Sequence, residues 1–294
     1  MRILVTGKNG QLGQSMIKIL NINPKYKSKQ HEFIFVGKDE LDLADKSSID
    51  FFFNKNKKFD IVVNCAAYTS VDKAEEEEEL ANLVNHLGVK YLAESIINQK
   101  GKLIHISTDY VFDGESKKPY DEMDKTHPIN VYGKTKLMGE RAVQETMPIN
   151  AIIIRTSWLY SEFGENFLKT ILRLGKEKNE IHIVNDQIGS PTYASDLADT
   201  ILKIVNNSKN QEWQPTQIYH YSNIGDVSWY SFAKKIFELG RINCKLNPIT
   251  TKQFPRPALR PKNSVMKKNK IMSIGISLHN YDKSIRECLS ALKF

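Results

Sequence analysis

The sequence is poor in cysteine and contains no long apolar run. Its 294 residues include three cysteines, Cys65, Cys244 and Cys288, which lie far apart and form no Cys-x-x-Cys pair. This spacing argues against a disulfide framework or a zinc site and favours a reducing compartment. No apolar stretch is long enough to cross a bilayer, and the chain opens on an apolar strand pattern rather than a signal peptide. We therefore expect a cytoplasmic protein with no membrane partner.

The sequence also lacks a dense basic stripe with interleaved aromatic residues, although its net charge is +8. The nearest approach to a basic cluster covers 252–256, 260–262 and 267–270. Nucleic-acid-binding proteins gather such residues on one face, so we expect no nucleic-acid partner. Small anionic ligands such as phosphates are the favoured partners, because electropositive clefts concentrate them.

Short apolar runs alternate regularly with amphipathic segments in the first half of the chain. Strand patterns at 3–6, 33–36, 60–64, 102–107 and 151–156 are separated by helical patterns. This alternation is typical of an α/β protein with a Rossmann-like, doubly wound parallel sheet. After Trp158 the rhythm becomes irregular, which indicates a smaller C-terminal substrate-binding region. We place the NAD(P)-binding Rossmann domain at 1–157 plus about 184–208, and the substrate domain at about 158–183 plus 209–294.

A glycine-rich segment follows the first strand pattern. Gly7, Gly10 and Gly13 are spaced Gly-x-x-Gly-x-x-Gly, and a helical pattern comes next. In this order, the glycines let the backbone approach a pyrophosphate at the helix N-terminus. The second strand pattern ends at 37–39 with no carboxylate directly at its end. Lys38 can meet a 2′-phosphate there, which favours NADPH, with NADH left as an alternative cofactor.

Three features follow the strand pattern at 60–64. The small residues at 65–67 suit a flat ring or a ribose lying close to the backbone. The acidic run at 75–79 is predicted to form the first turn of a helix that continues past Tyr91, because its charges complement the helix dipole. Asn85, inside that helix, is predicted to bond the backbone of a neighbouring element.

Tyr132 and Lys136 form a candidate catalytic pair. They are four residues apart at the start of a predicted helix and therefore share one face. A nearby ammonium favours the phenolate, so Lys136 is predicted to lower the pKa of Tyr132 toward neutral. Thr108, at the end of the strand pattern at 102–107, is placed to share the oxygen that gains or loses the proton. Tyr-x-x-x-Lys alone is common by chance, but the nucleotide-binding context favours a catalytic role.

Taken together, these segments resemble the dTDP-4-dehydrorhamnose reductases of the extended short-chain dehydrogenase/reductase superfamily. The resemblance runs from the first strand to the loop near Arg260. Its motifs occur in the same order along nearly the whole chain: Gly10-Gln11-Leu12-Gly13, Asn64-Cys65-Ala66-Ala67-Tyr68-Thr69-x-Val71-Asp72, Ser107-Thr108-Asp109-Tyr110, Tyr132-Gly133-Lys134-Thr135-Lys136, Arg155-Thr156-Ser157-Trp158, Asn166-Phe167, Asn185-Asp186-Gln187-x-Gly189-x-Pro191-Thr192 and Arg260-Pro261-x-Asn263-Ser264.

The resemblance implies a chemistry for these residues. It implies NADPH-dependent reduction of the C4 keto group of dTDP-4-dehydro-L-rhamnose, a step of dTDP-L-rhamnose and polysaccharide biosynthesis. Tyr132 would protonate the developing alkoxide, Lys136 would also bond the nicotinamide ribose, and Thr108 would bond the C4 oxygen. Further implied cofactor contacts are Gln11, Leu12, Asp42, Leu43, Ala66, Ala67, Tyr68 and Thr69. Implied substrate contacts are Val71, Asp109, Trp158 and Arg260, with Arg260 pairing with the diphosphate.

One departure from the family concerns metal. Some members are magnesium-bridged dimers held by carboxylates, and Ser15 and Ser195 stand at the corresponding positions here. We therefore predict no metal site and a monomer or weak homodimer. Two alternative functions stay open: reduction of another nucleotide-linked 4-keto sugar, and a non-catalytic NADP-binding regulatory subunit. The intact catalytic set argues against the second, because a binding module has no need for a tuned phenol.

Overall fold

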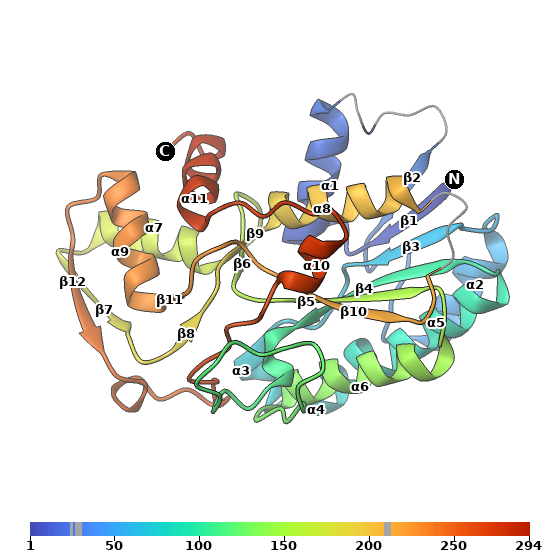
Figure 1. Ribbon diagram of the computed structural model, residues 1–294, viewed down its shortest axis with the longest axis horizontal. Coiled ribbons are helices and arrows are strands. Elements are labelled where there is room, and N and C mark those ends of the chain that lie inside the picture. Colours follow the sequence, from blue (N-terminus) through green and yellow to red (C-terminus); the bar gives the residue numbers. More distant parts are fainter. Residues whose placement is uncertain (24–25, 27–30, 209–212) are drawn as a thin grey trace.

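A six-stranded parallel sheet forms the larger lobe of the computed structural model, which describes residues 1–23, 26, 31–208 and 213–294 (Figure 1). Its order is β10-β5-β4-β3-β1-β2. The strands are β1 (Arg2–Thr6), β2 (Glu32–Val36), β3 (Ile61–Asn64), β4 (Lys102–Thr108), β5 (Ala151–Thr156) and β10 (Gln217–Tyr221). The direction of strand addition reverses between β1 and β3, and ligands of such sheets bind at the carboxyl ends near that reversal. The predicted Rossmann-like α/β fold is confirmed.

Helices cover both faces of this sheet, as Figure 1 shows. One face carries α1 (Gln11–Ile22) and α8 (Ala194–Asn207), and the other carries α2 (Lys46–Lys55), α5 (Gly88–Asn98) and α6 (Val131–Thr146). In β1, Ile3 and Val5 belong to the core under α1 and α8, whereas Leu4 belongs to the core under α2 and α5. Burial on both faces explains why the strands read as continuous apolar runs rather than alternating ones.

The sheet extends further than the predicted domain boundaries. We assigned the whole segment after 209 to the substrate domain, but β10 pairs in parallel with β5 and adds an edge strand to the main sheet. The apolar and aromatic run 218–221 buries against α10 (Asn269–Ser273) and the same core as α8, which is why it joins the larger lobe. The boundary at 209 itself lies outside the described residues.

The smaller lobe packs around its own core. Buried side chains of α7 (Phe167–Glu177), α9 (Trp229–Gly240) and α11 (Tyr281–Ala291) meet there, beside β7 (Glu180–Val184). Three short strand pairs complete the lobe: β7 with β12 (Lys245–Ile249), β8 (Ile188–Gly189) with β11 (Val227–Ser228), and β6 (Leu159–Tyr160) with β9 (Thr192–Tyr193). In the described parts of the chain, no helix has the length and apolar character needed to span a bilayer.

The helix predicted after β3 is interrupted in a way that the sequence did not indicate. The chain forms α3 (Val71–Ala74), α4 (Glu78–Asn82), a π-helical turn (Leu83–Leu87) and then α5. Glu78 and Glu79 lie in the first turn of α4, as the acidic run predicted. The π turn carries Asn85, and such turns occur frequently at functional sites.

Candidate functional site

A cavity of about 790 Å³ lies at the carboxyl ends of the main strands and reaches the smaller lobe. Every predicted site residue lines it except Gly13 and Arg260. The lining residues that we predicted are Gly7, Gly10, Gln11, Leu12, Lys38, Asp42, Leu43, Ala66, Ala67, Tyr68, Thr69, Val71, Thr108, Asp109, Tyr132, Lys136 and Trp158. The cavity therefore brings together the glycine loop and the Tyr132–Lys136 pair.

The glycine loop has the form that a dinucleotide requires. Gly7 has a φ of +72°, and a Cβ on Gly13 would lie 2.4 Å from the Gly7 carbonyl oxygen. Gly13 is therefore buried beneath the loop and lets it fold tightly, which explains its absence from the cavity wall. The helix α1 begins at Gln11 after the N-cap residue Gly10, with no side-chain cap and no acidic residue in its first turn. Its N-terminal N–H groups are thus left for an anion, so these residues fit a pyrophosphate.

Short contacts fix the start of α6 beside the end of β4. The Asn130 carboxamide oxygen accepts a hydrogen bond from Gly133 N at 2.7 Å, and Glu75 accepts one from Val131 N at 2.9 Å. A Cβ on Gly133 would lie 2.1 Å from the Tyr110 carbonyl oxygen. This close approach of backbones places Tyr132 next to Thr108.

The Tyr132 phenol and the Lys136 ammonium do not form the pair that we predicted. Lys136 is buried, and its Nζ donates to the Ile106 carbonyl at 2.6 Å. Burial lowers the pKa of Lys136 to about 8. Burial also raises the pKa of Tyr132 to about 12, although a hydrogen bond from Thr108 acts in the opposite direction. The prediction of a lowered Tyr132 pKa is wrong, because the Lys136 ammonium faces β4 and desolvation of the Tyr132 phenol is the largest effect.

Asp109 is a buried carboxyl group directly beside Thr108. Its Oδ1 accepts a hydrogen bond from the Thr108 hydroxyl at 3.1 Å, whereas Oδ2 has no hydrogen-bond partner of normal geometry among the described residues. Burial raises the pKa of Asp109 to about 7. The group can therefore carry a proton near neutral pH.

Asn85 makes the backbone bonds that its position predicted. Its side chain accepts from Tyr68 N at 2.9 Å and donates to Tyr68 O at 3.0 Å. Its Nδ2 also lies 3.3 Å from the Thr135 hydroxyl of α6. The π turn thus holds the cavity residue Tyr68 against the helix that carries Tyr132.

Two predicted substrate residues are engaged with the protein itself. Arg260 forms a bidentate ion pair with Asp72 of α3, which keeps it off the cavity wall and holds the pKa of the Asp72 carboxyl below its usual range. Trp158 stacks on Trp229 with ring centroids 3.4 Å apart. Its indole also lies over Gly189, where a Cβ would come within 2.5 Å of the ring.

The cavity also contains residues that sequence reasoning missed as site residues. Tyr110 packs edge-on against Tyr132, and Trp229 and Asn166 extend the wall into the smaller lobe. Asn166 donates from Nδ2 to the Gln11 side chain at 3.0 Å, joining the glycine loop to α7. Tyr110 and Asn166 lie inside quoted motifs and could have been found, but no pattern in the sequence marked Trp229.

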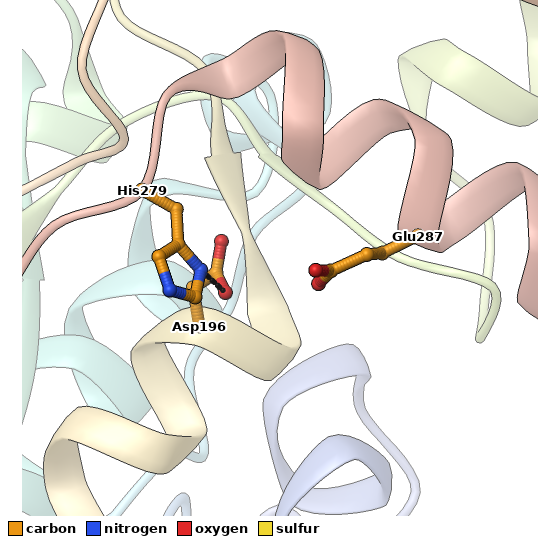
Figure 2. Close-up of side chains that lie close together, drawn as sticks. All are labelled: Asp196, His279 and Glu287. Carbon is orange, nitrogen blue, oxygen red and sulfur yellow. Dashed lines mark hydrogen bonds and ion pairs between the residues drawn. The ribbon is translucent and has the colours of Figure 1, made fainter.

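One group of potential metal ligands occurs in the described residues. Oxygen and nitrogen atoms of Asp196, His279 and Glu287 lie within 4.8 Å of one another (Figure 2). However, Asp196 already accepts hydrogen bonds from Asn223 at 2.6 Å and Ser284 at 2.5 Å, and its other oxygen lies 2.9 Å from His279 Nδ1. We therefore assign this group a structural role, in which α8 is tied to α11. None of the three lines the cavity.

Comparison with known proteins agrees with this arrangement. The family model described as "RmlD substrate binding domain" matches residues 1–294. A dTDP-4-dehydrorhamnose reductase of Aggregatibacter actinomycetemcomitans is 40% identical over 292 residues, with 97% of each chain covered. The spore coat polysaccharide biosynthesis protein SpsK of Bacillus subtilis is 38% identical over 288 residues, covering 98% of this chain and 96% of that protein.

A solved structure gives the same result. The dTDP-4-dehydrorhamnose reductase of Bacillus anthracis, solved in complex with NADP, is 37% identical and superimposes with a TM-score of 0.90 over 99% of both chains. The family match spans the whole chain, and these relatives share its length and fold. The protein therefore belongs to the RmlD family, in agreement with the resemblance that its motifs carry.

Proposed function

We propose that the protein reduces the C4 keto group of dTDP-4-dehydro-L-rhamnose to give dTDP-L-rhamnose, with NADPH as the reductant. The main support is that Thr108, Tyr132 and Lys136 line the same cavity as the glycine loop. A hydroxyl, a phenol and an ammonium at the mouth of a dinucleotide site are the groups that carbonyl reduction uses. The named reductases among its relatives support the choice of sugar.

The chain's own residues account for the proton side of this reaction. When bound, the nicotinamide would supply a hydride to the sugar C4, and the carbonyl electron pair would move to its oxygen. Tyr132 would give that oxygen its phenolic proton, and its raised pKa means that it carries this proton at neutral pH. Thr108 would hydrogen-bond the same oxygen, Lys136 would bond the nicotinamide ribose, and Tyr132 would regain its proton from solvent. Overall, the ketone, NADPH and one proton become the alcohol and NADP⁺.

Replacing Tyr132 with phenylalanine tests this assignment. The change removes one oxygen and leaves the ring against Tyr110, so NADPH binding should stay within about threefold while turnover falls by about 100-fold or more. The assay follows loss of the near-ultraviolet absorbance of NADPH with dTDP-4-dehydro-L-rhamnose as substrate. Full activity in the variant would refute the proton-donor role. Tight NADPH binding by the unaltered protein without oxidation would instead favour another nucleotide-linked 4-keto sugar or a non-catalytic subunit.

We further propose that NADPH is preferred over NADH. Lys38 lines the cavity after β2, and its Nζ lies 3.7 Å from the Asp42 carboxylate, an exposed pair that a 2′-phosphate can replace. Lys8 of the glycine loop pairs in the same way with Glu40. Lys38→Ala should weaken NADPH binding by about two- to tenfold and leave NADH binding unchanged, because an exposed ion pair contributes about 1 kcal/mol. Fluorescence titration of both cofactors measures this, and equal losses for the two would contradict it.

A further inference from the structure

The buried polar network behind the cavity centres on Glu140, which the proton chemistry above leaves unused. Glu140 lies one helical turn after Lys136 on α6 and is 1% exposed. Its Oε1 accepts hydrogen bonds from Ser107 Oγ at 2.5 Å and Arg155 Nε at 2.9 Å, and its Oε2 accepts one from Arg155 Nη2 at 2.7 Å. The carboxylate therefore connects the catalytic helix to the ends of β4 and β5.

Stability alone does not explain a buried ion pair of this kind. Removing two charges from water is costly, and apolar residues of similar volume often stabilise a protein equally well or better. Arg155 is 2% exposed and packs with its guanidinium 5.1 Å from the centre of the Phe112 ring. The residues that the Glu140–Arg155 pair contacts indicate a second role for it. Ser107 immediately precedes Thr108, and Lys136 shares a helix face with Glu140.

The electrostatic surroundings of Lys136 point to the same carboxylate. The described titratable groups that act on it are Glu140 on its own helix, Cys65 after β3 and His105 in β4. Burial raises the pKa of the Cys65 thiol and lowers that of His105, so both are neutral near neutral pH. Glu140, which is ion-paired with Arg155 of β5, is therefore the anion among them.

We infer that Glu140, held by Arg155, is a positioning residue for the reaction that we proposed above. It keeps Lys136 charged at the pH where the enzyme works, and it fixes Ser107 so that Thr108 faces Tyr132. The two effects are separable, because the first needs the negative charge and the second needs only a hydrogen-bond acceptor.

Two double variants distinguish these effects. Glu140→Gln with Arg155→Met removes both charges but leaves an amide oxygen for Ser107. We expect the alkaline fall in kcat/KM, which follows deprotonation of Lys136, to move about one pH unit lower, with kcat at low pH within about threefold of the original. Glu140→Leu with Arg155→Met also removes the acceptor. It should show the same pH shift, and kcat should fall by about 10- to 100-fold with KM for NADPH little changed.

Glu122→Gln is the matched control. Glu122 is buried and accepts from the His220 backbone N at 3.0 Å, and His220 in turn neighbours Arg155. Glu122 belongs to the same network but lies away from Lys136, so neither the alkaline fall in kcat/KM nor kcat itself should change. If the role of Glu140 is purely structural, the double variants will have a lower melting temperature, and the alkaline fall in kcat/KM will stay at the same pH. That result, or an unchanged kcat and alkaline fall in both folded double variants, would overturn the inference.

NADPH binding provides a readout that needs no sugar. If the unaltered protein fails to oxidise NADPH with the proposed sugar, the proposed function fails, but fluorescence titration of NADPH against pH still reports the charge on Lys136. Affinity should fall as Lys136 deprotonates, and the fall should occur at lower pH in the Glu140→Gln/Arg155→Met variant. Identical binding profiles would overturn the inference independently of the sugar.

Discussion

Asp109 and Tyr132 show how strongly burial determines the chemistry of single side chains at this site. Both lie beside Thr108, and burial raises the pKa of each, to about 7 and about 12 respectively. A phenol with a raised pKa holds its proton until a stronger base forms next to it, and a developing alkoxide is such a base. For the reaction that we propose, this arrangement favours donation of a proton over storage of a phenolate.

Asp109 also makes the stability of the protein depend on pH. Its pKa is 3.8 in ordinary surroundings and about 7 in the fold, so between these values the folded chain binds more protons than the unfolded chain. Stability from this group is full below about pH 4 and is lost as pH rises to about 7, by at most about 4 kcal/mol. Asp109→Asn should therefore become more stable relative to the unaltered protein as pH rises from 5 to 8, as estimated by urea unfolding.

The exposed residue Glu115 supplies the control for this prediction. Glu115→Gln removes a carboxylate outside the cavity and should leave the pH dependence unchanged. A constant difference in unfolding free energy between Asp109→Asn and the unaltered protein at all pH values would contradict the assigned pKa.

Identities of single site residues could be read from the sequence, but their electrostatics could not. Gly7, Thr108 and Tyr132 line one cavity, as their positions predicted, because glycine spacing and the order of strands fix which residues gather at the carboxyl ends of the sheet. The pKa direction for Tyr132 was wrong because it depends on where Lys136 points. That ammonium bonds the Ile106 carbonyl, a tertiary contact with no trace in local sequence.

Among the elements, the π turn between α4 and α5 has the clearest functional consequence. A regular helix would carry Asn85 past Tyr68, whereas the wider turn lets one side chain bond both the N–H and the C=O of Tyr68. The sequence indicated that Asn85 would bond a neighbouring backbone. It did not indicate the π turn, because hydrogen-bond register within a helix has no local sequence signature here.

Asn85→Ala should both destabilise the protein and weaken cofactor binding. It leaves the part-buried backbone N–H and C=O of Tyr68 without their side-chain partner, which should cost about 1–3 kcal/mol in total. Because Tyr68 lines the cavity, the Kd for NADPH should also rise. Thermal unfolding and fluorescence titration measure the two effects. Asn82→Ala, which removes only a contact to His86 in the same helix, should change neither, and an unaltered Kd in Asn85→Ala would disprove the link.

At the scale of the whole molecule, the cavity reaches from the larger lobe into the smaller one, and the Asp72–Arg260 ion pair lies next to the cavity residue Val71. Asp72 lies on α3 of the larger lobe beside Val71, and Arg260 lies on the loop that precedes α10. The sequence predicted the parallel sheet well because most of its strands are short apolar runs that alternate with helical patterns. It did not indicate that β10 pairs with β5, because the irregular segment before β10 carries no information about the partner of that strand.

The Asp72–Arg260 pair yields a prediction about how the substrate enters. If Arg260 binds the diphosphate, the ligand must compete with Asp72, since both are acceptors for one guanidinium. Arg260→Met should therefore raise the Kd for thymidine diphosphate by about 10- to 100-fold. Asp72→Asn should lower it by about three- to tenfold, because the competing charge is gone.

Arg256→Ala is the control: its guanidinium lies 4.0 Å from Asp72 and is half-exposed, so its effect should be small. Calorimetric titration of thymidine diphosphate at fixed salt measures these affinities. Weaker binding in both Asp72→Asn and Arg260→Met would contradict the competition, because it would mean that the ligand needs the intact ion pair and that Arg260 does not leave Asp72.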